Sequence, residues 1–160
     1  MRWFLAALIL ALTVTPLPAA AEKPVNVITN DGGGNVDDYL KWRAIKARKY
    51  SQVQILGRCN SACTMYLTLP NACIGPKAII GFHGTLPKTG IWSVDYWLDM
   101  RVGNHFRGEM RRRFEKEWRH HGGPNDFVFL NARQVRKLDP KIPECPPRPA
   151  KTKTKKKTGG

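Results

Sequence analysis

Acidic residues and nucleotide-binding motifs are scarce in this chain of 160 residues. It contains 12 Asp and Glu residues against 27 Lys and Arg residues, so its formal net charge at pH 7 is +15. Such an excess of positive charge favours non-specific contact with anionic surfaces of the cell envelope. The sequence has no Gly-x-x-x-x-Gly-Lys-Ser/Thr loop, which excludes ATP hydrolysis through a phosphate loop.

Two further absences limit the ligands that we expect the protein to bind. No readable nucleic-acid-binding motif and no pattern of stacking aromatic residues accompanies the basic segments, so we expect no specific recognition of DNA or RNA. No paired Cys-x-x-Cys spacing is present, which argues against a zinc site. We therefore expect neither a metal nor a cofactor.

Long apolar runs are also missing, apart from a short one over residues 3–14. Arg2 precedes this run, and three alanines ending at Ala21 follow it. The pattern is typical of a secretory signal peptide, which we expect to cover residues 1–21 and to be cleaved after Ala21. A membrane anchor is the alternative, but the run is too short to span a bilayer comfortably. We expect the mature protein to be periplasmic or secreted.

The remaining sequence is long enough for one core but not for two. We expect a single domain over residues 22–145 and a disordered tail over residues 146–160, which is rich first in proline and then in lysine. Such a tail serves either as an electrostatic tether to an anionic surface or only to increase solubility.

All four cysteines lie after the signal peptide: Cys59, Cys63, Cys73 and Cys145. An even number in an oxidising compartment favours disulfides, and four thiols allow three pairings. We favour Cys59 with Cys63, which would brace the turn around Ser61, and Cys73 with Cys145, which would tie the C-terminal segment to the core.

Three segments bring together the parts of a hydrolytic site. A strand over residues 25–29 is followed by a glycine turn, a helix that Asn35 caps and a second strand over residues 52–56, which together form a crossover unit of a parallel sheet. Ser61 follows that strand and opens a further helical run, and a third strand over residues 77–82 delivers His83 to the same edge of the sheet. Ser61 is alternatively a simple helix cap, and His83 a core histidine.

This ordered set of motifs resembles the Clp protease proteolytic subunit, closely over residues 25–84 and loosely over residues 124–139. The resemblance implies an α/β, Clp/crotonase-like fold with a small, mostly parallel sheet built from ββα-type crossover units. It also implies that Ser61 is the nucleophile and His83 the general base. The oxyanion hole would combine the Ala62 amide with an amide of Gly33 or Gly34.

The third member of a catalytic triad is less clearly marked. The family pattern places an acid before a short C-terminal helix, and the nearest match here is Asp126, offset by one residue. Asp126 is equally well explained as a surface turn residue, while Asp95 and Asp99 are outside candidates. A dyad of Ser61 and His83 is a further alternative.

Apolar residues recur every fourth position over residues 94–119, which predicts a long helix with a basic opposite face. Its apolar row drifts around the axis and cannot face one flat core, so we expect part of it to contact other structure. In the resembled superfamily a long helix after the His strand contributes to subunit contacts, which implies a possible homo-oligomer. Gly103 and Gly108 are positions where the helix is expected to bend or break.

The sequence thus favours an exported, ATP-independent serine hydrolase, a peptidase acting on a peptide or protein substrate. A catalytically inactive Clp-like scaffold or binding protein of the cell envelope is the alternative. A crotonase-like enzyme acting on acyl thioesters is less favoured, because free coenzyme A is scarce outside the cytoplasm.

Overall fold

The computed structural model describes residues 21–147. The expected signal peptide falls outside this range except for its last residue, and the expected tail falls outside it from residue 148 onward. The elements follow one another in this order: β1 (Val25–Asp31), α1 (Val36–Lys49), β2 (Gln52–Asn60), the 3₁₀ helix η1 (Ser61–Thr68), β3 (Ala72–Ile74), β4 (Ile79–Phe82), α2 (Trp92–Gly103), α3 (Gly108–Lys116), the short 3₁₀ helix η2 (Trp118–His120), β5 (Val128–Asn131) and α4 (Ala132–Leu138).

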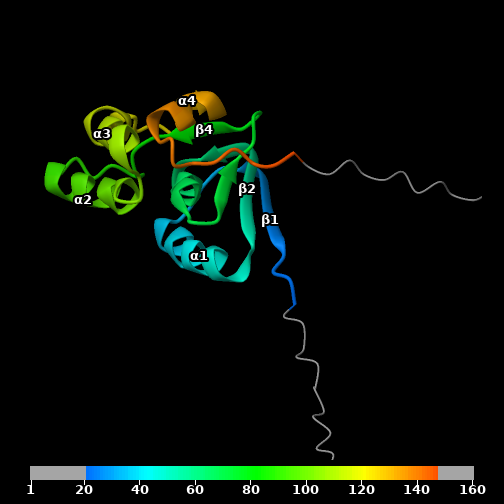
Figure 1. Ribbon diagram of the computed structural model, residues 1–160. Helices are drawn as coiled ribbons and strands as arrows, with labels where there is room; N and C mark the ends of the chain where they lie inside the picture. The colour runs from blue at the N-terminus through cyan, green and yellow to red at the C-terminus, as the bar shows by residue number, and fades with distance from the viewer. Residues whose placement is uncertain (1–20, 148–160) are drawn as a thin grey trace, which may run out of the picture.

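The strands form one five-stranded sheet, and the expected mixed α/β architecture is confirmed (Figure 1). Its main path runs β1-β2-β4-β5, and β3 pairs separately with β2. β2 is parallel to β1, β3 and β4, whereas β4 and β5 are antiparallel. Because β2 and β4 are parallel neighbours, the residues that follow them emerge at the same edge of the sheet, which places Ser61 and His83 on one side of the molecule.

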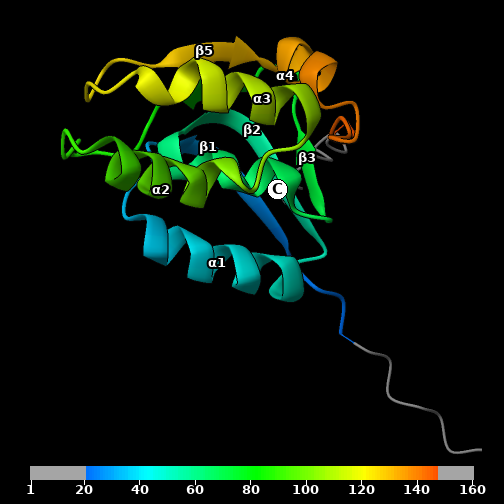
Figure 2. The same cartoon turned by 90° about the vertical axis from the view of Figure 1, so that its left-hand side faces the viewer.

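The helices lie on one face of the sheet (Figures 1 and 2). Side chains alternate across a strand, so one set points into the helical layer and the other points away from it. On the inner face Ile28, Ile55 and Ile80 are buried, whereas Val27, Ile79 and Phe129 remain exposed. The core therefore lies between the sheet and the helices.

The first helix begins as its sequence indicates. The Asn35 side chain accepts hydrogen bonds from the backbone amides of Asp37 and Asp38, which satisfies two of the free donors at the helix start. The tight turn that precedes this cap contains Gly33, whose φ is +84°. The glycine turn and the helix start thus form one rigid corner at the edge of the sheet.

The single long helix expected over residues 94–119 is instead divided into α2 and α3. α2 ends at Gly103, and α3 begins at Gly108, whose φ of +52° lies in the left-handed region. The break has a packing reason, because Phe106 and the later apolar residues of the row are buried while Val94 is exposed. A straight helix would have rotated part of this row away from the core.

Two disulfides join the cysteines in the pairs that the sequence favoured, Cys59–Cys63 and Cys73–Cys145. The first spans the start of η1 and encloses Ser61, with 5.4 Å between its two Cα atoms. The second connects β3 to the segment after α4 over a sequence separation of 72 residues. Together they fix the turn that carries Ser61 and hold the C-terminal segment against the sheet.

Candidate active site

Ser61 occupies a strained turn between β2 and η1. Its φ of 53° makes it the one non-glycine residue with a positive φ in the part of the chain that the structure describes. A positive φ costs a non-glycine residue conformational free energy, and residues with such a φ are concentrated at functional sites. A sharp strand-to-helix turn of this kind exposes a serine hydroxyl, as in the nucleophile turns of serine hydrolases.

The glycine turn packs directly against this serine. A Cβ atom built on Gly33 would lie 2.5 Å from the Ser61 Cβ and 2.7 Å from the Asn60 carbonyl oxygen. These distances are shorter than any real carbon contact, so only glycine fits at this position. The backbone after β1 is thereby brought against the first residue of η1.

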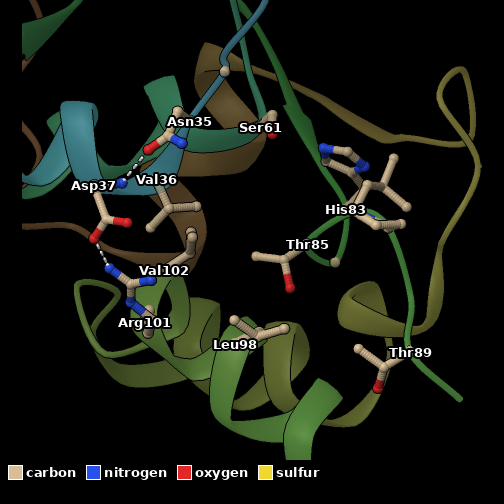
Figure 3. A pocket seen from close by; sticks show the side chains of 14 residues that line it. Asn35, Val36, Asp37, Ser61, His83, Thr85, Thr89, Leu98, Arg101 and Val102 are labelled. Atoms are coloured by element: carbon tan, nitrogen blue, oxygen red, sulfur yellow. Dashed lines mark hydrogen bonds and ion pairs between the residues drawn. The ribbon is translucent and has the colours of Figure 1, made fainter. Parts of the chain in front are cut away.

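Ser61 and His83 line one cavity of about 560 Å³ (Figure 3). Its walls come from the start of α1, the segment after β4 and one side of α2. Val36, Leu98 and Val102 supply apolar surface, and Asp37 forms an ion pair with Arg101 at one side. The size and mixed lining suit part of a small organic substrate or a few residues of an extended peptide.

The His83 side chain is buried, and its ring packs against Phe127 in a tilted arrangement with 4.3 Å between the ring centroids. Neither ring nitrogen has a hydrogen-bond partner within residues 21–147. Burial, helped by the positive charge of Lys88, lowers the pKa of His83, and Asp126 and Asp99 oppose this shift. The imidazole is therefore neutral at pH 7, which is the state that a general base requires.

The candidate oxyanion donors differ in their availability. The Gly33 amide donates to Asp31 Oδ1 at 2.9 Å, so it is already engaged. The Tyr39 hydroxyl donates to the same carboxylate, and burial together with Asp31 raises the pKa of Tyr39, which keeps this donor protonated. Asp31 thus holds the glycine turn in place, and the amides of Gly34 and Ala62 are the better candidates for an oxyanion.

Asp126 has a different partner from the one that a triad requires. Its Oδ1 lies 2.7 Å from His121 Nδ1, and this contact is the main reason that the pKa of Asp126 is lowered. Asp126 raises the pKa of His83 and His83 lowers that of Asp126, but through charge and not through a hydrogen bond. In this structure its hydrogen bond goes to His121.

The segment after His83 is held by an aspartate that sequence reasoning placed only among the outside candidates. Asp99 is fully buried and accepts hydrogen bonds from the Thr85 amide at 2.7 Å and from the Thr85 hydroxyl at 2.8 Å. Lys88 Nζ lies 2.9 Å from both of its carboxylate oxygens, and Arg119 Nη1 lies 3.6 Å away. Asp99 therefore positions one wall of the cavity and does not bond His83. Asp95, the other outside candidate, bonds Thr89 and Gly90.

The backbone immediately after His83 is also closely packed. The Gly84 amide donates to the His121 carbonyl oxygen at 2.9 Å. A Cβ atom at Gly84 would lie 2.1 Å from the Arg119 carbonyl oxygen, so no larger residue fits without movement. These contacts join the segment that carries His83 to the segment that carries Asp126.

Sequence reasoning missed several of these supporting residues. The role of Asp31 has a local signal, because an aspartate commonly binds the amide two residues later in a turn. The contacts of Phe127, His121 and Lys88 have no local signal, since each depends on a partner distant in the sequence or on a loop conformation.

No group of three or more His, Cys, Asp or Glu side chains in residues 21–147 is arranged to hold a metal ion. Among the same residues, no helix is long and apolar enough to cross a membrane.

Comparison with known proteins gives structural likenesses but no sequence-level match. No family model matches the chain, and no curated protein does so. The structure is similar to that of the ClpP protease catalytic domain from Plasmodium falciparum, with a TM-score of 0.47 and 18% sequence identity. The match covers 78% of this chain and 69% of that one. At this distance the likeness assigns no activity, and the roles of individual residues rest on the geometry of this chain.

Proposed function

We propose that the protein is an exported serine hydrolase that acts through an acyl-enzyme on Ser61. The observation that carries the proposal is the strained left-handed conformation of Ser61 at a cavity that it shares with the buried, neutral His83. A non-glycine residue that is held in a strained backbone conformation is typical of a functional turn.

In the proposed mechanism His83 removes the proton of the Ser61 hydroxyl as this hydroxyl attacks a substrate carbonyl. The developing negative charge is stabilised by the amides of Gly34 and Ala62, each worth about 3 to 4 kcal/mol in comparable sites. Neither ring nitrogen of His83 bonds Ser61 in the empty site. A bond between nucleophile and base is often long in an empty site and shortens when substrate binds, and the mechanism requires such a movement here.

The proposed triad requires Asp126 to exchange its partner from His121 to His83. Without that exchange the site is a dyad of Ser61 and His83, whose imidazole is held by tilted packing against Phe127 and by close packing of the backbone after it. The geometry described here favours the dyad, because the carboxylate of Asp126 is satisfied by His121.

The proposed substrate is a peptide or protein, taken in a flexible state because the chain has no phosphate loop with which to drive unfolding. The two disulfides fit an oxidising compartment, which supports a periplasmic or secreted location. A homo-oligomer through the region of α2 and α3 remains part of the proposal.

A non-catalytic scaffold is the second candidate. It is favoured by one observation, the absence of a hydrogen-bond partner for either nitrogen of the His83 ring in residues 21–147. Under this reading the cavity binds a ligand without converting it.

The test is labelling with a fluorophosphonate, read as the intact mass of the oxidised chain beginning at Glu22. A single adduct that disappears in Ser61→Ala and in His83→Ala supports the activated serine. Ser61→Gly is the matched folding control, because glycine accepts the positive φ of this position without strain. No adduct on a folded wild-type chain, under conditions where a known serine hydrolase reacts, would refute the hydrolase and leave the scaffold.

A further inference from the structure

Buried polar atoms without a hydrogen-bond partner gather at two neighbouring residues of the candidate site. Of the five such side-chain atoms in residues 21–147, three belong to Asn60 and His83: Oδ1 of the asparagine and both ring nitrogens of the histidine. Asn60 is only 6% exposed and His83 only 9%. Because buried polar groups nearly always find a partner, these unpaired atoms require an explanation.

The two side chains come from neighbouring strands at the same edge of the sheet. In the parallel pair of β2 and β4, Asn60 lies opposite Gly81, and His83 follows two residues later in the chain. A Cβ atom built on Gly81 would lie 2.6 Å from Asn60 Oδ1, so only glycine leaves room for the amide at this point of β4. Asn60 and His83 are thus diagonal neighbours, whose side chains can meet when one of them carries a ring.

Two phenylalanines connect the amide to the imidazole. Phe129, which lies opposite Gly81 on β5, has its Cε1 atom 2.9 Å from the Cβ position of this glycine. The ring of Phe127 packs against both Phe129 and His83, with 5.5 Å and 4.3 Å between the centroids. The Asn60 amide, the two aromatic rings and the imidazole therefore form one contiguous group, in which apolar neighbours would strengthen a hydrogen bond.

Asn60 also belongs to the turn that carries the candidate nucleophile. It directly precedes Ser61, and a Cβ atom on Gly33 would lie 2.7 Å from its carbonyl oxygen. The residue before it, Cys59, is joined to Cys63. The backbone of Asn60 is therefore held as closely as that of Ser61, which suits a residue that has to position another side chain.

The acidic residues that could orient His83 have other partners. Asp126, Asp99 and Asp95 are all engaged in hydrogen bonds, and none of these bonds involves His83. An amide oxygen carries no charge, but it accepts a hydrogen bond from an imidazole N–H and can take the place of the carboxylate in a site of this type.

We propose that Asn60 orients the His83 imidazole, with its Oδ1 accepting a hydrogen bond from the Nδ1–H. Nε2 is then left unprotonated and can take the proton of the Ser61 hydroxyl. This inference rests on the proposed hydrolase function. The amide and the imidazole are not bonded to each other in this structure, so the contact forms with the same movement that brings His83 to Ser61.

The experiment compares Asn60→Asp and Asn60→Ala in the oxidised chain from Glu22 onward, which retains every helix and strand described here. NMR titration of the His83 ring proton, assigned with His83→Ala, gives the pKa of this residue, and fluorophosphonate labelling is measured at pH 8. Asn60→Asp places a carboxylate where the amide stands, so we expect the pKa of His83 to rise by about 1 or more. Asn60→Ala leaves the imidazole without an acceptor, and its labelling should be at least about tenfold slower than that of Asn60→Asp.

Gln54→Glu is the matched control, because Gln54 lies on the same strand and the substitution adds the same charge. Gln54 is half-buried and is outside the cavity that contains Ser61, so the pKa of His83 and the labelling rate should stay at their wild-type values. Circular dichroism verifies that each variant is folded.

Three results would overturn the proposal: an unchanged pKa of His83 in folded Asn60→Asp, an equal rise of this pKa in Gln54→Glu, or equal labelling of Asn60→Ala and Asn60→Asp. The titration does not depend on activity. A wild-type chain that is not labelled, together with a raised pKa of His83 in Asn60→Asp, would refute the hydrolase but support the position of the amide beside the imidazole, so the two failures are distinguishable.

Discussion

Replacement of Gly33 by alanine should damage both the stability and the reactivity of the Ser61 turn. Gly33 has a φ of +84°, and alanine in this region costs about 1 to 2 kcal/mol. The new methyl group would also lie 2.5 Å from the Ser61 Cβ and 3.1 Å from the Ala62 nitrogen, next to backbone that has little freedom to move. Overpacking of this kind typically costs about 1 to 3 kcal/mol.

The two contributions sum to a loss of about 2 to 5 kcal/mol in the free energy of unfolding of Gly33→Ala. Urea unfolding of the oxidised protein measures this loss, which corresponds to a midpoint shift of roughly 1 to 2.5 M for a urea slope of about 2 kcal/mol per M. The rate of fluorophosphonate labelling should also fall in Gly33→Ala, because Ser61 and the candidate oxyanion amides are displaced.

Gly90→Ala is a control matched in backbone conformation. Gly90 has a φ of +78°, but no atom lies within 4 Å of a Cβ built there. It should therefore lose only the conformational part, about 1 to 2 kcal/mol, and keep its labelling. Equal destabilisation by the two alanines, with labelling retained in Gly33→Ala, would refute the close packing of the glycine turn on Ser61.

Three other outcomes follow from the site. Burial lowers the pKa of His83 below its ordinary value of 6.5, so the labelling rate measured against pH should have its midpoint below pH 6.5. Near this pH the unfolded chain then binds more protons than the folded one, so the free energy of unfolding should fall as the pH drops through 6.5. A labelling midpoint above pH 7 would contradict the lowered pKa of His83. Asp126→Asn should change the labelling rate by less than about threefold, because the carboxylate bonds His121, whereas a working triad would lose about 10⁴-fold. Replacing Cys73 and Cys145 by serine should lower the free energy of unfolding by about 4 kcal/mol in a urea titration, and a loss under 1 kcal/mol would show that this loop closure stabilises little.

The parts of the site that follow from the sequence are those set by local patterns and strand order. Short sequence patterns predict the apolar strands and the capped helix. Because parallel strands bring their carboxyl ends to one edge of the sheet, Ser61 and His83 could be placed on one side of the molecule. The positive φ of Ser61 has no such signature in the sequence, because this turn packs against Gly33, a residue from a distant part of the chain.

The partners of charged residues were harder to predict. The sequence favours Asp126 as the acid and leaves Asp99 an outside candidate, but the folded chain assigns Asp126 to His121 and Asp99 to Thr85 and Lys88. The division of the helix over residues 94–119 has the same origin. Two glycines permit the break, but burial of Phe106 against Phe82 and Phe114 determines that it occurs.

The arrangement of helices on one side of the sheet makes the two faces unequal in their response to mutation. Along β2, Val53 and Ile55 are buried in the core, whereas Gln54 between them is half-buried, because neighbouring residues of a strand point to opposite faces of the sheet. Truncating an inward residue leaves a cavity and costs about 2 to 5 kcal/mol, while a polar change on the outward side costs little. Sequence variation compatible with folding should therefore alternate from one residue to the next over residues 52–56, and the outward positions there are where new surface properties can arise without loss of the core.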